Sequence, residues 1–148
     1  MKDGNRTYPV NLLVMHHAVS DPFKNWTDIA VQDWFSNVGK SRGYNNGAVN
    51  PRHEHPGRAG QLTYSMAQYC LREYTADNNK YGWRLTTLIK LPFDNVAWHA
   101  GVWSVNQRSL GIETAGNYLN KVLPEKALML IADTFRAHDK SIGGILDI

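Results

Sequence analysis

Three titratable residues stand where the surrounding sequence is otherwise apolar or small. They are His16, at the end of an apolar segment, His99, directly after Trp98, and Glu113, inside an apolar segment. Imidazole is the commonest metal ligand in proteins and a frequent general base. A carboxylate inside an apolar strand must be paired, hydrogen-bonded or functional, because burying it alone is costly. Together these positions predict a polar site built over a β-sheet.

Each of these residues also has a purely structural interpretation. His16 could be satisfied by a backbone carbonyl, His99 could belong to an aromatic cluster over a sheet edge, and Glu113 could pair with a nearby Arg or Lys. His17 follows His16 directly and points to the opposite face if the strand continues, because side chains alternate along a strand. At most one of these two histidines should therefore ligate a metal.

The other histidines and the single cysteine are predicted to be structural. His53 and His55 form a His-x-His pair between two prolines, which favours a solvated basic loop over a zinc site. His138 lies beside cations in the last helical segment and is predicted to be a solvated residue that complements the helix dipole. Cys70 is predicted to be a small buried core residue, and a lone cysteine excludes an internal disulfide.

The elements that must position these side chains follow from apolar periodicity. Strands are predicted over residues 12–15, 67–71, 85–89 and 110–114. Helices are predicted from about Asp28 to Val38, with Thr27 as the N-cap, and from Pro124 to about Lys140. The glycine-rich stretch 39–60 reads as a long functional loop, and residues 145–148 resemble the start of a further strand. This order predicts an α/β fold with a mixed central sheet flanked by helices.

Length and composition narrow the class of protein. A chain of 148 residues with 43% hydrophobic and 20% charged residues suits one soluble domain. The net charge of +3 comes without a basic run, so nucleic acid is not expected as a partner. No apolar run reaches the roughly 18 residues of a membrane helix, and no signal-type segment follows the N-terminus. We therefore expect no membrane partner and no signal peptide. Serine hydrolase and phosphate-loop motifs are also missing.

Four segments occur in an order that resembles a known family. They are Leu13–His17, Ala67–Tyr69, Val96–Gly101 and Ser109–Glu113. Together they are similar to the zinc-dependent N-acetylmuramoyl-L-alanine amidases, and in particular to the amidase domains of phage or prophage endolysins, in the superfamily of the peptidoglycan recognition proteins. The resemblance covers most of the chain. It implies a single amidase-like catalytic domain over residues 1–148.

The resemblance also implies an activity and a set of site residues. The enzyme would cleave the amide bond between N-acetylmuramic acid and the L-alanine of the stem peptide in bacterial peptidoglycan. His16 would be the first Zn²⁺ ligand, and Glu113 would activate water. The implied substrate-binding residues are Trp98, His99, Tyr69 and His17, with Gln68 as a further candidate beside Tyr69.

Two further expectations follow from the resemblance. Relatives carry their other zinc ligands in a late strand, so these ligands are expected beyond Ile148, and the 148-residue chain is expected to lack that strand and to bind zinc poorly. We expect a monomer that stays in the host cytoplasm until release and then acts on the cell wall. The alternative is a non-catalytic peptidoglycan-binding module on the same fold, against which Glu113 argues because a pure binder needs no carboxylate facing the metal position.

Overall fold

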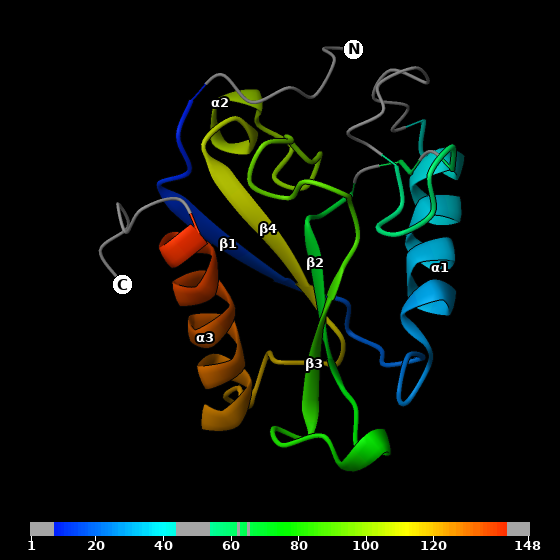
Figure 1. The fold of residues 1–148 in the computed structure, drawn as a ribbon, viewed down its shortest axis with the longest axis vertical. Helices are drawn as coiled ribbons and strands as arrows, with labels where there is room; N and C mark the ends of the chain where they lie inside the picture. Colours follow the sequence, from blue (N-terminus) through cyan, green and yellow to red (C-terminus); the bar gives the residue numbers. More distant parts are fainter. Residues whose placement is uncertain (1–7, 44–53, 62, 65, 142–148) are drawn as a thin grey trace.

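A four-stranded mixed β-sheet with a helix on each face forms the centre of the molecule (Figure 1). The computed structural model describes residues 8–43, 54–61, 63–64 and 66–141. The strands are β1 (Leu12–His17), β2 (Tyr69–Glu73), β3 (Trp83–Thr87) and β4 (Ser109–Thr114). The helices are α1 (Asp28–Ser41), α2 (Trp103–Asn106) and α3 (Glu125–Ser141), with a short 3-10 turn η2 (Ala76–Asn78). The predicted mixed sheet flanked by helices is confirmed.

The strand order β1-β4-β2-β3 combines two kinds of pairing. β4 lies parallel to both β1 and β2, whereas β3 is antiparallel to β2. The register aligns one residue from each strand in a single row across the sheet, namely His16, Glu113, Cys70 and Thr86. Residues in register on neighbouring strands point to the same face, so this row of four side chains shares one face of the sheet.

Helix α1 covers the face that carries this row. Its N-cap is Thr27, whose Oγ1 accepts a hydrogen bond of 3.2 Å from the backbone N–H of Ala30. Val31 and Phe35 bury the apolar side of the helix in a cluster that includes Cys70. The cap and the start at Asp28 confirm the prediction, and the helix continues past Val38 to Ser41. Cys70 is fully buried, as predicted.

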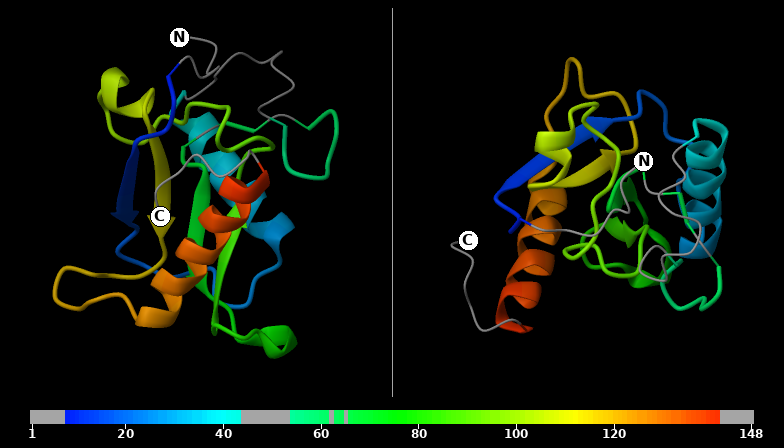
Figure 2. Two further views of the ribbon diagram at one scale, coloured as in Figure 1. Left: turned by 60° about the vertical axis from the view of Figure 1, so that its left-hand side comes forward. Right: turned by 90° about the horizontal axis from the view of Figure 1, so that it is seen from above.

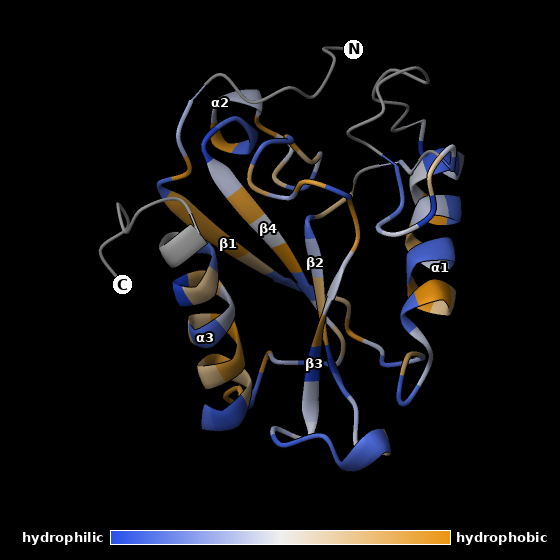
Figure 3. Cartoon of the chain, in the orientation of Figure 1, coloured by the Kyte–Doolittle hydropathy of each residue, from blue (hydrophilic) through white to orange (hydrophobic). Residues whose placement is uncertain are grey.

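Helix α3 covers the opposite face (Figure 2). Ala127 and Ile131 pack there against Tyr69, Leu71 and Ile112. Figure 3 shows orange, apolar segments in the strands and alternating blue and orange segments along α1 and α3. The sheet therefore separates two apolar cores, and each helix contributes one apolar stripe.

The two edges of the sheet differ in character. β1 is an edge strand whose apolar side chains remain accessible: Leu12 is 39% exposed and Leu13 is 44% exposed. Among the described strands, none pairs with the outer side of β1. At the β3 edge, the Thr87 carbonyl accepts a hydrogen bond of 3.0 Å from Gln32 Nε2 of α1.

Several predicted boundaries are corrected by the structure. The second strand covers Tyr69–Glu73 rather than 67–71, and the third covers Trp83–Thr87 rather than 85–89. The shifts place Arg72 in β2 and Arg84 in β3. Both arginines can be accommodated there because each forms an ion pair with Asp28. The predicted strand at 145–148 lies outside the described residues. In the described part of the chain, no helix has the length and apolar character needed to span a bilayer.

Candidate active site

His16, His99 and Glu113 converge on the face of the sheet that α1 covers. His16 and Glu113 are register partners on adjacent strands. The Nε2 atom of His16 lies 3.1 Å from Nδ1 of His99, and the two rings meet edge to face at 73°. Two imidazoles from distant parts of the chain thus meet, and Glu113 lies in register with His16 on the same face of the sheet.

The ring of His99 is held close to the sheet because residue 111 has no side chain. A Cβ atom built on Gly111 would lie 2.6 Å from both Cγ and Cδ2 of His99. Such contacts are far inside van der Waals distance, so any larger residue would displace the ring. The glycine in the fourth segment therefore serves a close approach between the loop and β4.

The backbone around His99 is anchored by the short helix α2. Oδ1 of Asn106 accepts hydrogen bonds from the backbone N–H groups of Ala100 at 3.0 Å and His99 at 3.4 Å. Asn106 is 1% exposed. The helix was not predicted from the sequence, because four residues show too little periodicity.

Ser109 determines which nitrogen of His99 carries the proton. Its hydroxyl lies 2.7 Å from the Val105 carbonyl and 2.9 Å from Nε2 of His99. A carbonyl can only accept, so the single hydroxyl proton goes to Val105 and the oxygen accepts from His99 Nε2–H. In the neutral ring, the lone pair is then on Nδ1, which faces His16. The site therefore contains a histidine of fixed tautomer.

Burial shifts the pKa values of His16 and Glu113 in opposite directions. It lowers the pKa of His16, which favours the neutral imidazole. It raises the pKa of Glu113, and the positive charge of Arg42 opposes this shift. A neutral nitrogen donor and a carboxylate with raised proton affinity suit metal binding and general base catalysis, respectively.

His16 could supply one ligand of a zinc site. His16 offers a neutral, half-buried imidazole nitrogen, which is a preferred Zn²⁺ ligand. Over residues 8–43, 54–61, 63–64 and 66–141, however, no three His, Cys, Asp or Glu side chains are grouped so that they could hold a metal ion. A complete zinc site would need ligands from outside these ranges.

A cavity of about 240 Å³ adjoins His99 on the side of α2. It is lined by Trp98, His99, Gly101, Trp103 and Asn106. The two tryptophan rings stack with their centroids 4.8 Å apart and their planes at 29°. Trp98 therefore adjoins the candidate site as the sequence predicted, and Trp103 joins it although it was not singled out.

Two predicted substrate-binding residues lie on the other face of the sheet. Tyr69 is 5% exposed and packs in the α3 core, with its ring 6.2 Å from that of Phe135. His17 accepts a hydrogen bond of 3.0 Å at Nδ1 from the backbone N–H of Tyr118. The alternation expected for His16 and His17 is therefore observed. The structure does not bring Tyr69 or His17 to the site of His16 and Glu113.

Gln68 has a structural position instead. Its Oε1 accepts from the Gly111 N–H at 2.6 Å, and its Nε2 donates to the Asn95 carbonyl at 3.0 Å. The side chain is fully buried. Gln68 thus ties the loop that carries His99 to β4.

Two other histidine predictions are wrong in part. His55 is not solvated: it is 4% exposed and lies 3.8 Å from Asp33, because residues 54–61 fold back against α1. His138 is half-buried and stacks on Phe93, with ring centroids 3.5 Å apart. Both rings are covered by aromatic or loop contacts that local sequence does not reveal. His53 lies outside the described residues.

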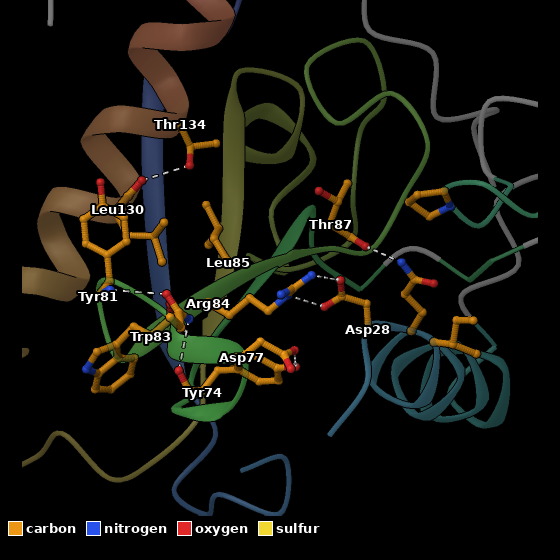
Figure 4. Close-up of a pocket in the computed structure, with 14 residues that line it drawn as sticks. Asp28, Tyr74, Asp77, Tyr81, Trp83, Arg84, Leu85, Thr87, Leu130 and Thr134 are labelled. Carbon is orange, nitrogen blue, oxygen red and sulfur yellow. Dashed lines mark hydrogen bonds and ion pairs between the residues drawn. The ribbon is translucent and has the colours of Figure 1, made fainter. Parts of the chain in front are cut away.

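A larger cavity, of about 690 Å³, lies outside β3 between α1 and α3 (Figure 4). Its charged side chains bind one another: Asp28 receives hydrogen bonds from Arg84 at 2.9 and 2.6 Å. Tyr74 likewise donates to Asp77 at 2.7 Å. Since its polar groups are already paired, this cavity offers less chemistry than the smaller site around His99, despite its size.

Comparisons with known proteins give a family match and two similar solved structures. A family model described as N-acetylmuramoyl-L-alanine amidase matches residues 6–140. Among solved structures, the endolysine N-acetylmuramoyl-L-alanine amidase LysCS from Clostridium intestinale URNW aligns with a TM-score of 0.50 and 17% identity, over 90% of this chain and 64% of that chain. N-acetylmuramoyl-L-alanine amidase LysC from the same organism aligns with a TM-score of 0.49 and 17% identity, over 90% and 65%. No curated protein sequence matches the chain.

Proposed function

Because the chain belongs to the N-acetylmuramoyl-L-alanine amidase family, we propose that it hydrolyses the amide bond between N-acetylmuramic acid and the L-alanine of the peptidoglycan stem peptide. The chain spans 64% of the length of the solved amidase LysCS, whose likeness supports the fold. The activity of this chain is therefore argued from its own site residues.

The observation that carries the proposal is the convergence of His16, His99 and Glu113. These residues come from β1, the loop before α2, and β4, and they meet on one face of the sheet. The neutral tautomer of His99 is fixed by Ser109. Burying a carboxylate such as Glu113 costs stability, which favours a functional role for it over a purely structural one.

Zinc is the cofactor that we propose, with the imidazole of His16 as one of its ligands. When bound, zinc would supply Lewis-acid polarisation of the scissile carbonyl and lower the pKa of a bound water to about 7. The other ligands would come from outside the described residues.

Glu113 is the proton carrier of the proposed reaction. Its raised pKa brings it closer to the working range of a general base. It would take a proton from the attacking water and deliver that proton to the alanine nitrogen as the amide bond breaks. Trp98 and His99 would hold the junction between sugar and peptide, with Nδ1 of His99 beside His16.

We also propose the biological setting that such an enzyme implies. A phage-type endolysin acts on the bacterial cell wall after release from the host cytoplasm, and a monomer suffices because all three residues come from one chain. The runner-up function is a wall-binding module without catalysis. It is favoured by one observation: within the described residues, three metal-binding side chains are not grouped together.

The test measures cleavage and metal content separately. Purified peptidoglycan is incubated with the 148-residue chain, and with the same chain extended beyond Ile148, and newly exposed alanine amino groups are counted. Zinc content is determined after dialysis against micromolar zinc, for wild type and His16→Ala. We expect the extended form to release stem peptides and to lose zinc on His16→Ala. Binding to walls without any release of alanine amino groups would instead establish the wall-binding module, and unchanged zinc content in His16→Ala would remove His16 from the ligand set.

A further inference from the structure

The cavity of about 690 Å³ beside β3 opens onto the outer edge of the sheet, and we propose that it binds an extended segment of a partner protein as an added β-strand. The added strand would pair with β3 at Leu85. This edge lies across the sheet from β1, the strand that carries His16. The inference is therefore independent of the proposed amidase activity.

The outward-facing backbone groups of β3 follow from its pairing with β2. The backbone N–H of Tyr74, directly after β2, donates to the Gly82 carbonyl at 3.0 Å. The two strands are antiparallel, so every second residue of β3, counted from Gly82, bonds to β2, and the residues between them direct their backbone groups away from it. The N–H and C=O groups of Trp83, Leu85 and Thr87 therefore point outward.

Side chains already occupy both ends of this outward row. The Trp83 carbonyl accepts a hydrogen bond of 2.7 Å from Asn79 Nδ2, and the Thr87 carbonyl accepts one of 3.0 Å from Gln32 Nε2. Both bonds agree with the outward direction of these carbonyls. Leu85 lies between them, and none of the residues that the structure describes bonds its outward N–H or C=O.

The free groups of Leu85 select a peptide as the ligand. They place one donor and one acceptor on a single residue, and the residue opposite it in an antiparallel strand exchanges both hydrogen bonds with it. The two occupied carbonyls are four residues apart on β3, which is about 13 Å along a strand. This length suits a short extended segment, and such segments bind to exposed sheet edges through their backbone groups.

The walls of the cavity match the alternating side chains of such a segment (Figure 4). Leu85 packs toward the core beneath α3, and Leu130 and Thr134 of that helix line the same cavity. On the side of α1, Asp28 and Arg84 line it and bind each other. The ligand residue opposite Leu85 should therefore be apolar, and its neighbours should be neutral and polar, because these wall charges are already paired.

The recessed position of the edge favours a single extended segment over a second copy of this chain. Both α1 and α3 contribute residues to the cavity, on either side of β3. The free edge therefore lies between two helices, in a space within the roughly 300–1,000 Å³ of small-ligand pockets. A lone peptide strand can enter that space, whereas the β1 edge of a second copy would bring its own folded domain with it.

The first experiment uses the pentapeptide acetyl-Thr-Thr-Val-Thr-Thr-amide as the probe. It is titrated into the ¹⁵N-labelled 148-residue chain, and the amide signals are followed by NMR. We expect saturable binding, with the largest shifts at the amides of Trp83, Leu85 and Thr87 and none in β1. Absence of saturable binding, or shifts confined to β1, would overturn the proposal.

A second peptide tests the hydrogen bond itself. It is the same pentapeptide with an N-methyl group on the valine, which removes the N–H that the Leu85 carbonyl would accept. Leaving that carbonyl without its partner should weaken binding about tenfold. Equal affinities for the two peptides would overturn the proposal, and this comparison needs no variant of the protein.

Variants of Leu85 then locate the site. Leu85→Pro removes the outward N–H, and edge strands tolerate proline where the N–H faces away from the sheet. Leu85→Val is the matched control, since it keeps the N–H and an apolar side chain. We expect about tenfold weaker peptide binding in Leu85→Pro and wild-type binding in Leu85→Val. A Leu85→Pro chain that is folded, judged by circular dichroism, and binds like wild type contradicts the assignment; if it does not fold, the N-methylated peptide decides.

Sedimentation of the chain without peptide tests the other occupant. We expect no association through this edge at increasing protein concentration. A dimer that shifts the amides of Trp83, Leu85 and Thr87, and that the peptide dissociates, would assign the cavity to a second copy and overturn the proposal of a partner strand.

Discussion

One row of side chains across the sheet ends in two polar clusters that differ in how completely their charges are paired. At the β1 end, His16 and Glu113 lie beside His99. At the β3 end, Thr86 lies beside Asp28 of α1. Both clusters lie on the face covered by α1, and the fully buried Cys70 occupies the row between them.

The β3 cluster is saturated with hydrogen bonds. Asp28 accepts from Arg72, Arg84 and Thr86, and Arg72 also donates to the carbonyls of Phe23 and Trp26. Burial alone would raise the pKa of Asp28, but the hydrogen bonds from Arg84, Thr86 and Arg72 outweigh it and hold this pKa below its ordinary value. The cluster joins the start of α1 to two strands.

In the β1 cluster, the carboxylate of Glu113 titrates differently from that of Asp28. Glu113 feels the charge of Arg42, yet burial still keeps its pKa above the ordinary value. The pKa values of Glu113 and Asp28, in the two clusters, are thus shifted in opposite directions. A buried carboxylate such as Asp28, which accepts several hydrogen bonds from cations, can stabilise the fold. A buried carboxylate with a raised pKa, such as Glu113, is instead suited to proton transfer.

The largest expected effect comes from breaking the saturated cluster. Arg72→Met should lower the free energy of unfolding by about 3 kcal/mol, because it strands buried acceptors and removes a cation from Asp28. Urea denaturation measures this change. Arg136→Met is the control: its side chain is 57% exposed in a surface pair with Asp133, and we expect a change within about 0.5 kcal/mol. Equal effects of the two variants would contradict the structural role of Arg72.

Removing the charge of Glu113, in the β1 cluster, should lower the amidase activity. Glu113→Gln should reduce the amidase turnover of the extended chain by roughly a hundredfold or more, the usual scale for a general acid–base group. Zinc content should be unchanged, because Glu113 is not placed as a ligand. Release of alanine amino groups from purified walls is the assay. Near-normal turnover would show that Glu113 is structural.

The close approach between His99 and β4 can be tested by adding one methyl group. Gly111→Ala should displace the His99 ring and cost about 1–3 kcal/mol of stability by overpacking. Turnover should fall with it, since His99 would lose its position beside His16. Ser104→Ala, on the exposed side of α2, serves as the control. A Gly111→Ala chain with unchanged stability and unchanged histidine NMR signals would refute the tight contact.

The smallest effect is the opposite pH dependence of the two carboxylates. Asp28 has a lowered pKa in the folded state, so its contribution is present above its ordinary value of 3.8 and is lost as the pH falls through the folded pKa. Glu113 has a raised pKa, so its contribution is present below its ordinary value of 4.5 and is lost as the pH rises through the folded pKa.

Stability measured against pH separates the two carboxylates. Asp28→Asn should flatten the loss of stability in acid, whereas Glu113→Gln should make the chain more stable than wild type at neutral pH and equally stable well below pH 4.5. If Glu113→Gln is less stable than wild type at neutral pH, the carboxylate is paired more fully than the geometry indicates.

Local signals in the sequence predicted the parts of this structure that depend on neighbouring residues. Thr27 before Asp28 identified the start of α1, and alternation along the strand separated His16 from His17. The single carboxylate in an apolar strand directed attention to Glu113. These inferences need only the periodicity and capping of one element.

The remaining features depend on contacts between distant segments. Tyr69 was expected near the substrate, but the side of the sheet it faces is set by its pairing with Ile112 and Thr87. The role of Ser109 requires knowing that Val105 and His99 lie on either side of its hydroxyl. The sequence shows that Ser109 lies two positions before Gly111, but this spacing does not indicate which groups the hydroxyl contacts.

The accessible flank of β1 has a consequence for how the chain behaves in concentrated solution. Leu12 and Leu13 present exposed apolar side chains on a strand that no other described strand flanks on its outer side. Such an edge is a template for intermolecular β-sheet growth. Colloidal stability of the isolated chain is therefore governed by this short stretch, and a lysine at position 13 would act as a gatekeeper against aggregation without touching the chemistry at His16.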